Sequence, residues 1–222
     1  RRRVVKVKKR GYREELVEAD MPMVYAGVNA LQRTPWQINT QVYEVLNHIW
    51  EIGSGLGGIP PKNGLELPPK PTDIDTNEDA RKAFRRDTAK AHQLNVSLMG
   101  QRIGFQLAID IASRYKGFRK IAFPYQLDFR GRVYAVPHLN PQGADYQKGL
   151  LRFANGKPLG SEGWKWLAMH GANLAGNDKC SLEDRVQWTL ENESEICAIA
   201  ADPYGEKGWA NEVGGMKIDK PW

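Results

Sequence analysis

Apolar positions at helical spacing predict two helices near the start of the chain. Between residues 20 and 51, apolar side chains recur every three or four positions, as expected for one face of a helix. They are Val24, Val28 and Leu31 in the first set, and Ile38, Val42, Val45, Leu46 and Ile49 in the second. The two predicted helices meet near Pro35. We expect Thr34 to be the N-cap of the second helix, with Pro35 in its first turn, where a missing backbone donor costs nothing.

A region without periodicity follows. Residues 53–75 are rich in glycine and proline, which predicts a loop or linker. The stretch GSGLGG, residues 53–58, lacks both the GxxxxGK(S/T) pattern of a phosphate loop and the GxGxxG pattern of a dinucleotide site. We therefore interpret it as part of a flexible loop.

A long helix is predicted from Thr76 to about Lys116, because this stretch contains no proline and opens with acidic residues. Either Asp75 or Thr76 is expected to cap it. About forty residues at about 1.5 Å each would span about 60 Å, so we expect Gly100 or Gly104 to break the helix. Its second half is apolar and is expected to pack on the core.

The first half of this predicted helix carries Lys82, Arg86 and Lys90 at a spacing of four residues, so the three cations share one face. A stripe of one charge sign could lie along a phosphate backbone. The alternative is a solvated face whose charge is balanced by Asp79 and Asp87.

Residues 120–139 predict two short strands joined by a turn. An apolar stretch comes first, Pro124 favours the turn, and β-branched and aromatic residues follow. Arg130, Arg132 and Tyr134 occupy alternate positions of the second segment. In an extended segment these three side chains would project from one face.

The sequence DFRGRVY, residues 128–134, combines groups that suit a nucleic-acid backbone. Arginine forks bind phosphate through paired hydrogen bonds, and a tyrosine ring can stack on a base or sugar. Gly131 would let a ligand approach the backbone closely, and Asp128 could orient one of the arginines. The alternative is a surface ion-pair cluster on a half-exposed strand.

The last third of the chain, residues 157–222, predicts further helices. Trp164, Leu167 and Leu174 form an apolar stripe in the first of them. His170 stands among small residues and is interpreted as a packing residue rather than a catalytic one. The acidic stretch 181–202 predicts an amphipathic helix with four apolar residues facing inward, namely Leu182, Val186, Leu190 and Ile196.

The composition is that of a soluble globular protein. The 222 residues, 41% of them hydrophobic, can bury one substantial core or two modest ones. We read no membrane span and no signal peptide in the sequence, and both ends look cut because the chain opens on Arg1 without a methionine. Two cysteines without zinc spacing favour a reducing compartment, with the cytosol as the default.

The net charge of +6 is concentrated at one end. Residues 1–10 hold seven of the 32 basic residues and no acidic one, which leaves 25 bases against 26 acids in the rest of the chain. This arm is a candidate phosphate-binding segment. It could equally be a solvated tail, or an edge strand in which Val4, Val5 and Val7 alternate imperfectly.

Residues 123–179, from FPYQLDFRGRVYAVP to GANLAGNDK, resemble the DxxGR-motif region of the single-subunit RNA polymerases of bacteriophages and mitochondria. The stretch MPMVYAGVNALQRTPWQIN, residues 21–39, is similar to the helical region before the thumb of that family. Residues 181–222 resemble its palm insertion.

The resemblance implies roles for individual residues. Arg132 would contact the template strand or the RNA–DNA hybrid, Asp128 would support that geometry, and Tyr134 would lie near the template. Arg130, at a variable position of the motif, belongs to the same candidate nucleic-acid-binding set. Lys179 would lie near the phosphates of the incoming nucleotide. The helix from residue 76 resembles the thumb, which favours hybrid contacts for its cationic stripe of Lys82, Arg86 and Lys90.

The family implies DNA-directed RNA synthesis, with DNA template, RNA–DNA hybrid, nucleoside triphosphates and the remainder of the polymerase as partners, and no membrane. Its two-metal chemistry needs paired carboxylates, which the family supplies beyond the matched region. We therefore expect Mg²⁺ to be held outside this chain, no catalytic or metal-binding residue on it, and no nucleotide incorporation by it alone. The cytoplasm of a phage-infected cell is favoured over the mitochondrial matrix. The alternative function is a non-catalytic nucleic-acid-binding or regulatory module.

Together these patterns predict an α+β chain that is mainly helical. We expect the end of an amino-terminal helical region over 1–52, a loop over 53–75 and a long thumb-like helix over 76–116. A partial palm with a small antiparallel β unit would follow over 117–156, and a helical palm insertion over 157–222.

Overall fold

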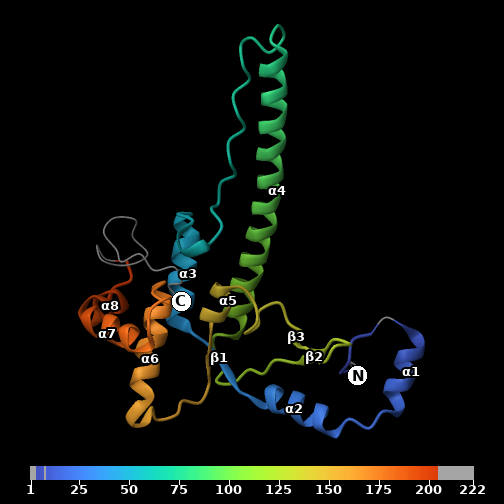
Figure 1. Ribbon diagram of the computed structural model, residues 1–222, viewed down its shortest axis with the longest axis vertical. Coiled ribbons are helices and arrows are strands. Elements are labelled where there is room, and N and C mark those ends of the chain that lie inside the picture. The colour runs from blue at the N-terminus through green and yellow to red at the C-terminus, as the bar shows by residue number, and fades with distance from the viewer. Residues whose placement is uncertain (1–3, 8, 205–222) are drawn as a thin grey trace.

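The computed structural model describes residues 4–7 and 9–204, and it is an α+β structure that is mainly helical (Figure 1). The helices are α1 (Arg10–Glu18), α2 (Pro22–Arg33), α3 (Thr40–Ile52), α4 (Glu78–Tyr115), α5 (Asp145–Gly149), α6 (Gly160–Leu174), α7 (Leu182–Glu191) and α8 (Glu193–Ala201), with a 3-10 turn η1 (Leu56–Gly58). The strands are β1 (Trp36–Ile38), β2 (Tyr125–Leu127), β3 (Val133–Ala135) and β4 (Leu151–Phe153). The described strands form two small antiparallel sheets, which confirms the expected fold class.

The boundary between α2 and α3 differs from the prediction. Thr34 does not cap α3 but ends α2, where its hydroxyl donates to the carbonyl of Ala30 at 3.2 Å. Strand β1 follows Pro35, and Asn39 is the N-cap of α3, its side chain accepting from the backbone of Val42 at 3.5 Å. The prediction was wrong because β1 is held by strand β4 from a distant part of the chain, which the local pattern does not reveal.

The core lies where the C-terminal half of α4 meets α3 and the β1–β4 sheet. The ring of Phe105 lies 5.1 Å from the rings of both Trp50 and Tyr146. The largest fully buried side chains are Phe105, Leu46, Ile49, Leu139 and Leu150. The expectation that the second half of the long helix packs on the core is confirmed.

Helix α4 runs unbroken for 38 residues, through Gly100 and Gly104. At about 1.5 Å per residue it is about 57 Å long, and its N-terminal half stands away from the core (Figure 1). Asn77, rather than Asp75 or Thr76, is its N-cap, with its side chain accepting from two backbone N–H groups of the first turn. The glycines are tolerated because one glycine costs a helix only about 1 kcal/mol relative to alanine.

The loop between α3 and α4 runs back along α4 and is bonded to it (Figure 1). The side chain of Asn95 accepts from the backbone N–H of Leu65 at 2.7 Å and donates to its carbonyl at 2.9 Å. The guanidinium of Arg102 donates to the carbonyls of Pro61 and Asn63. Residues 53–75 are therefore a loop apart from η1, as predicted, but part of it is tied to the helix.

Strands β2 and β3 pair with Leu127 opposite Val133 and Tyr125 opposite Ala135. The turn between them comprises residues 128–132 and does not lie at Pro124, which precedes β2. The predicted turn was misplaced because a proline also fits just before an edge strand, where its missing N–H breaks no ladder bond.

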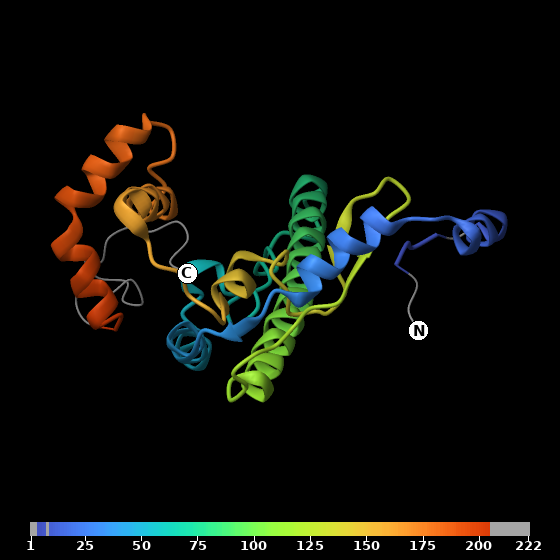
Figure 2. The same cartoon turned by 90° about the horizontal axis from the view of Figure 1, so that it is seen from below.

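Helices α6, α7 and α8 form a separate group beside the core (Figure 2). The buried residues of α6 are Ala168 and Ala172, small side chains that let α7 pack closely. The expected apolar stripe is wrong, because Leu167 is 60% exposed and Trp164 is also exposed. The acidic stretch forms two helices separated at Asn192, not one. The expected inward positions of that stretch also fail in part, at Leu182 and Leu190, which are both exposed.

No helix among the described residues is long and apolar enough to cross a membrane.

Candidate nucleic-acid interface

Asp128 organises the turn of the β2–β3 hairpin. Its carboxylate accepts from the backbone N–H groups of Arg130 at 2.9 Å and Arg132 at 3.0 Å. The guanidinium of Arg130 donates twice to its Oδ2, at 3.0 and 2.8 Å, and the hydroxyl of Tyr134 reaches the same oxygen at 3.4 Å. One carboxylate thus accepts from two backbone N–H groups and two side chains of the turn and its flanking strand, as aspartate side chains commonly do in turns.

The turn also explains the glycine of the motif. Gly131 has a φ of 79°, which favours glycine, and no atom lies within 4 Å of where its Cβ would be. Backbone conformation therefore requires the glycine here, rather than lack of space. Whether a ligand approaches the backbone at Gly131 stays a prediction.

The two arginines of the turn have different surroundings. Arg130 forms an ion pair with Asp128, and this hydrogen bond raises the pKa of the guanidinium. Desolvation acts to raise the pKa of Asp128, but the hydrogen bonds from Arg130 and Arg132 outweigh it and the net pKa is lowered. Arg132 is exposed, and its guanidinium has no hydrogen-bond or ion-pair partner within residues 4–7 and 9–204. Arg132 is the cation of this turn that is free to bind an anion.

The predicted common face of Arg130, Arg132 and Tyr134 is not formed as expected. Only Tyr134 lies in a strand, β3, while both arginines belong to the turn. The structure brings Arg130 and Tyr134 together through Asp128 instead, which confirms that Asp128 orients one of the arginines. The extended pattern failed because the turn bends the chain between positions 130 and 132.

The basic amino-terminal arm lies beside this hairpin. Val5 forms a parallel bridge with Leu127, and the backbone N–H of Lys6 donates to the carbonyl of Leu127 at 2.7 Å. For residues 4–7 this favours the edge-strand alternative over a free tail, and it places exposed Lys6 near the turn. Of the other basic positions, Lys9 and Arg10 lie at the start of α1, and positions 1–3 and 8 lie outside the described residues.

The cationic stripe lies on the part of α4 that extends away from the core, remote from the hairpin at the opposite end of the helix (Figure 1). Lys82 lies 3.8 Å from Glu78, and Arg86 lies 2.9 Å from Asp87. The hydrogen bond from Arg86 lowers the pKa of Asp87, and the charge of Lys90 acts in the same direction. These exposed ion pairs are weak, so the stripe remains accessible to a phosphate backbone.

Lys179 lies in the loop between α6 and α7, and Figures 1 and 2 place this helix group on the other side of the core from the hairpin. Its side chain is 89% exposed, with its ammonium 3.3 Å from the carboxylate of Asp178. His170 on α6 is exposed, contrary to the expected packing role, and lines a cavity with Asp145 and Lys148. The structure does not bring Lys179 or His170 to the hairpin turn.

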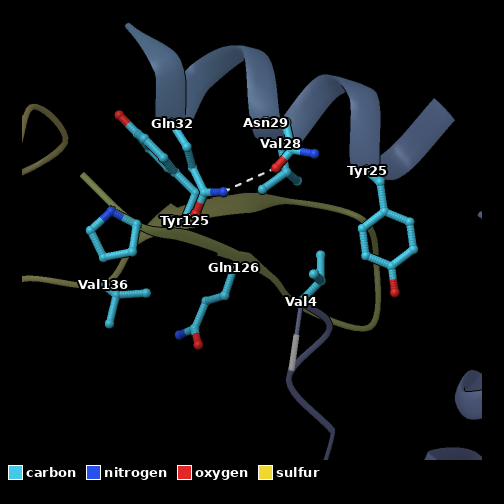
Figure 3. Close-up of a pocket in the computed structure, with 9 residues that line it drawn as sticks. Val4, Tyr25, Val28, Asn29, Gln32, Tyr125, Gln126 and Val136 are labelled. Atoms are coloured by element: carbon cyan, nitrogen blue, oxygen red, sulfur yellow. Dashed lines mark hydrogen bonds between the residues drawn. The ribbon is translucent and has the colours of Figure 1, made fainter. Parts of the chain in front are cut away.

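Helix α2 packs against strand β2 of the hairpin (Figure 3). The carbonyl of the Gln32 side chain accepts from the backbone N–H of Tyr125 at 3.1 Å, and its amide donates to Asn29 at 3.3 Å. A cavity of about 140 Å³ lies between α2, the hairpin and Val4. Nothing in the sequence pattern singled out Gln32, because its partner is 93 residues away.

The described residues contain no group of three or more His, Cys, Asp or Glu side chains that could hold a metal ion. The carboxylate of Asp128 is fully engaged with the turn. The donor set of the hairpin therefore does not fit a divalent metal.

Comparison with known proteins agrees with these features. The family model for DNA-dependent RNA polymerase matches residues 157–222. The chain is 43% identical over 197 residues to the DNA-directed RNA polymerase of Enterobacteria phage K11, covering 88% of this chain and 22% of that protein. It is 41% identical over 194 residues to T7 RNA polymerase of Escherichia phage T7, covering 86% of this chain and 22% of that protein.

A mitochondrial DNA-directed RNA polymerase of Neurospora crassa is 33% identical over 209 residues, which cover 93% of this chain and 14% of that protein. The chain thus spans about a fifth of the length of its phage relatives. Nearly all of it aligns with both phage and mitochondrial enzymes, so the chain belongs to the single-subunit, phage-type family of DNA-directed RNA polymerases.

Proposed function

We propose that this chain is the part of a DNA-directed RNA polymerase that holds the DNA template and the RNA–DNA hybrid during transcription. The observation that carries the proposal is the hairpin turn, in which Asp128 accepts from the backbone N–H groups of Arg130 and Arg132 while the guanidinium of Arg132 stays exposed and without a partner among the described residues. A hydrogen-bonded turn that presents one free guanidinium suits bidentate binding of a backbone phosphate.

The surrounding residues have supporting roles in this proposal. Tyr134 is exposed beside the turn, and its ring would stack on a base or sugar of the template. Arg130 would act mainly through its ion pair with Asp128. The stripe of Lys82, Arg86 and Lys90, on the thumb-like helix α4, would follow the hybrid backbone.

The reaction of the whole enzyme would be attack of the RNA 3′-hydroxyl on the α-phosphorus of a nucleoside triphosphate, with release of pyrophosphate. A divalent metal ion, Mg²⁺ in this proposal, would be held by residues outside this chain. Lys179 would bind the nucleotide phosphates. The remainder of the polymerase is the expected protein partner. We favour the cytoplasm of a phage-infected host cell, and the mitochondrial relatives make the organelle matrix the second choice.

The test compares two conservative variants in a complete polymerase that carries this segment. Arg132→Lys keeps the charge but loses the bidentate fork, so we expect transcript elongation to fall by about tenfold or more. The melting temperature should change little, because an exposed unpaired arginine contributes little to stability. Arg130→Lys should reduce the elongation rate less, since the guanidinium of Arg130 is already bound to Asp128.

Elongation rate and thermal unfolding are measured for both variants and the parent enzyme. Unchanged elongation in Arg132→Lys, or a melting drop that accounts for the whole loss, would show that the turn is only a structural ion-pair cluster.

A further inference from the structure

The loop that carries Lys179 is held by one side chain from the following helix. Arg185, on α7, donates from Nη2 to the carbonyl of Asp178 at 2.8 Å. It also donates to the carbonyl of Cys180, from Nη2 at 3.0 Å and from Nε at 3.2 Å. The two carbonyls that flank Lys179 in the chain are thus bound by the same guanidinium.

Arg185 also ties the loop to the preceding helix. Its Nη1 donates to the side-chain carbonyl of Asn173 on α6 at 3.0 Å. The loop is also held by the backbone bond from Asn177 to the carbonyl of Ala172 at 2.9 Å, by that from Gly176 to the carbonyl of Asn173 at 3.2 Å, and by the thiol of Cys180, which donates to the side chain of Asn177 at 3.5 Å. A planar guanidinium can hold three acceptors in a fixed geometry, which an ammonium cannot do.

The partners of Arg185 are all neutral. Its four hydrogen bonds go to two backbone carbonyls and one amide oxygen, and no carboxylate of the described residues forms an ion pair with it. Arg185 is therefore not neutralised by a direct ion pair among the described residues. Lys179 itself pairs with Asp178 in the same loop at 3.3 Å, and an anionic ligand would compete with this exposed, weak ion pair.

We propose that Arg185 is a positioning residue that fixes the backbone on both sides of Lys179, so that the ammonium is presented in one place to the phosphates of the incoming nucleotide. This inference rests on the proposed role of Lys179. We call this set of hydrogen bonds from Arg185 the Arg185 clamp. Without it, Lys179 would keep its charge, but its backbone would have to be ordered each time a nucleotide binds, which weakens binding.

The experiment is a double-mutant cycle in a complete polymerase that carries this segment, with Lys179→Ala, Arg185→Ala and the double variant. KM for nucleoside triphosphates and kcat are measured together with thermal unfolding. Each single variant should raise KM by about five- to tenfold with a smaller change in kcat. If Arg185 acts through Lys179, its substitution in the Lys179→Ala background should raise KM by less than about twofold.

Two further variants serve as controls. Gln187→Ala, on the same helix, removes a side chain that donates to Glu191 and should leave KM unchanged. Arg185→Lys keeps the charge and the helix propensity, and it replaces Arg185→Ala if that variant fails to fold. A KM close to that of Arg185→Ala is expected, since the ammonium cannot hold both carbonyls.

The outcomes distinguish the proposed phosphate role of Lys179 from the proposed positioning role of Arg185. If Lys179→Ala leaves KM unchanged, the proposed phosphate role of Lys179 fails, and the clamp proposal fails with it. If Lys179→Ala raises KM but neither Arg185 variant does, the clamp proposal alone is overturned. Equal effects of the Arg185 substitution in both backgrounds would show that it stabilises the helix group without acting through Lys179.

Discussion

Asp128 decides the conformation of the hairpin turn at the scale of single residues. Its side chain is only 19% exposed, and it accepts hydrogen bonds from two backbone N–H groups and from the Arg130 guanidinium. Arg132 takes part in the turn through its backbone alone, which leaves its side chain available. The motif thus assigns one arginine to the structure of the turn and one to the proposed ligand.

Acid should weaken the turn, and Asp128→Asn should remove this effect. Because the pKa of Asp128 is lowered in the folded chain, its contribution is complete above the unfolded pKa of about 4 and is lost as pH falls through the folded value. We expect the parent to melt higher than Asp128→Asn by a constant margin between about pH 5 and pH 7, with the margin shrinking below about pH 4.

Thermal unfolding over this pH range provides the measurement. Asp20→Asn, at an exposed position between α1 and α2, is the matched control and should melt with the parent throughout. A margin that does not depend on pH would mean that the ionised carboxylate of Asp128 is not what stabilises the turn.

At the scale of elements, α4 depends on the segment that returns along it. Asn95 binds both backbone groups of Leu65, in the manner of a strand neighbour. Glycine suits this close approach at position 64, because a Cβ there would lie 2.9 Å from Oδ1 of Asn95 and would displace the side chain that binds Leu65. The middle of α4 is thereby bonded to a segment that has no regular structure of its own.

Asn95→Ala should release this segment from α4. Two exposed hydrogen bonds are lost, so we expect a destabilisation of only about 1 kcal/mol. Protease cleavage within residues 61–75 should nevertheless become several-fold faster, because local opening controls such cleavage. Gln101→Ala, an exposed position on the same helix, is the control. Equal cleavage of Asn95→Ala and the parent would show that the segment is held by other contacts.

At the scale of the whole molecule, the cationic groups are spread over separate surfaces. The hairpin turn and Lys6 lie at one end of α4, and the stripe of Lys82, Arg86 and Lys90 lies toward the other (Figure 1). A hybrid duplex that touched both surfaces would have to run along the helix. Its binding would then be dominated by phosphate contacts.

Salt should therefore weaken binding of an RNA–DNA hybrid steeply. The logarithm of affinity is expected to fall by about one per phosphate contact for each tenfold increase in salt. Replacing Lys82, Arg86 and Lys90 together by glutamine should reduce this slope by about three. The control makes the same charge change away from α4 in the sequence, at Lys148 on α5, Lys157 between β4 and α6, and Lys165 on α6. Kd between about 50 and 200 mM salt is the measurement; an unchanged slope in the α4 variant would identify its stripe as a solvated face.

The sequence predicted the elements that have a long or repeated pattern. A long helix after residue 76, the existence of α2 and α3, the loop over 53–75 and the existence of a hairpin around the DxxGR motif all followed from periodicity and composition, whereas α1 and the unbroken course of α4 through Gly100 and Gly104 did not. Each depends on neighbours within a few positions, which a linear pattern records. The candidate ligand residues Arg132 and Lys179 also came from the sequence, through a motif and a resemblance that extend over more than fifty residues.

The tertiary structure decided what depends on distant partners. Strand β1 exists because it pairs with β4, and three residues carry too little pattern to predict a strand without that partner. The inward face of α6 is set by close packing of Ala168 and Ala172 against α7, not by its largest side chains. The different surroundings of Arg130 and Arg132, and the bond from Gln32 to the hairpin, depend on a turn and on contacts in space. Residue types and local spacing are properties of the sequence, whereas the direction of a side chain and its partner are set only when the chain has folded.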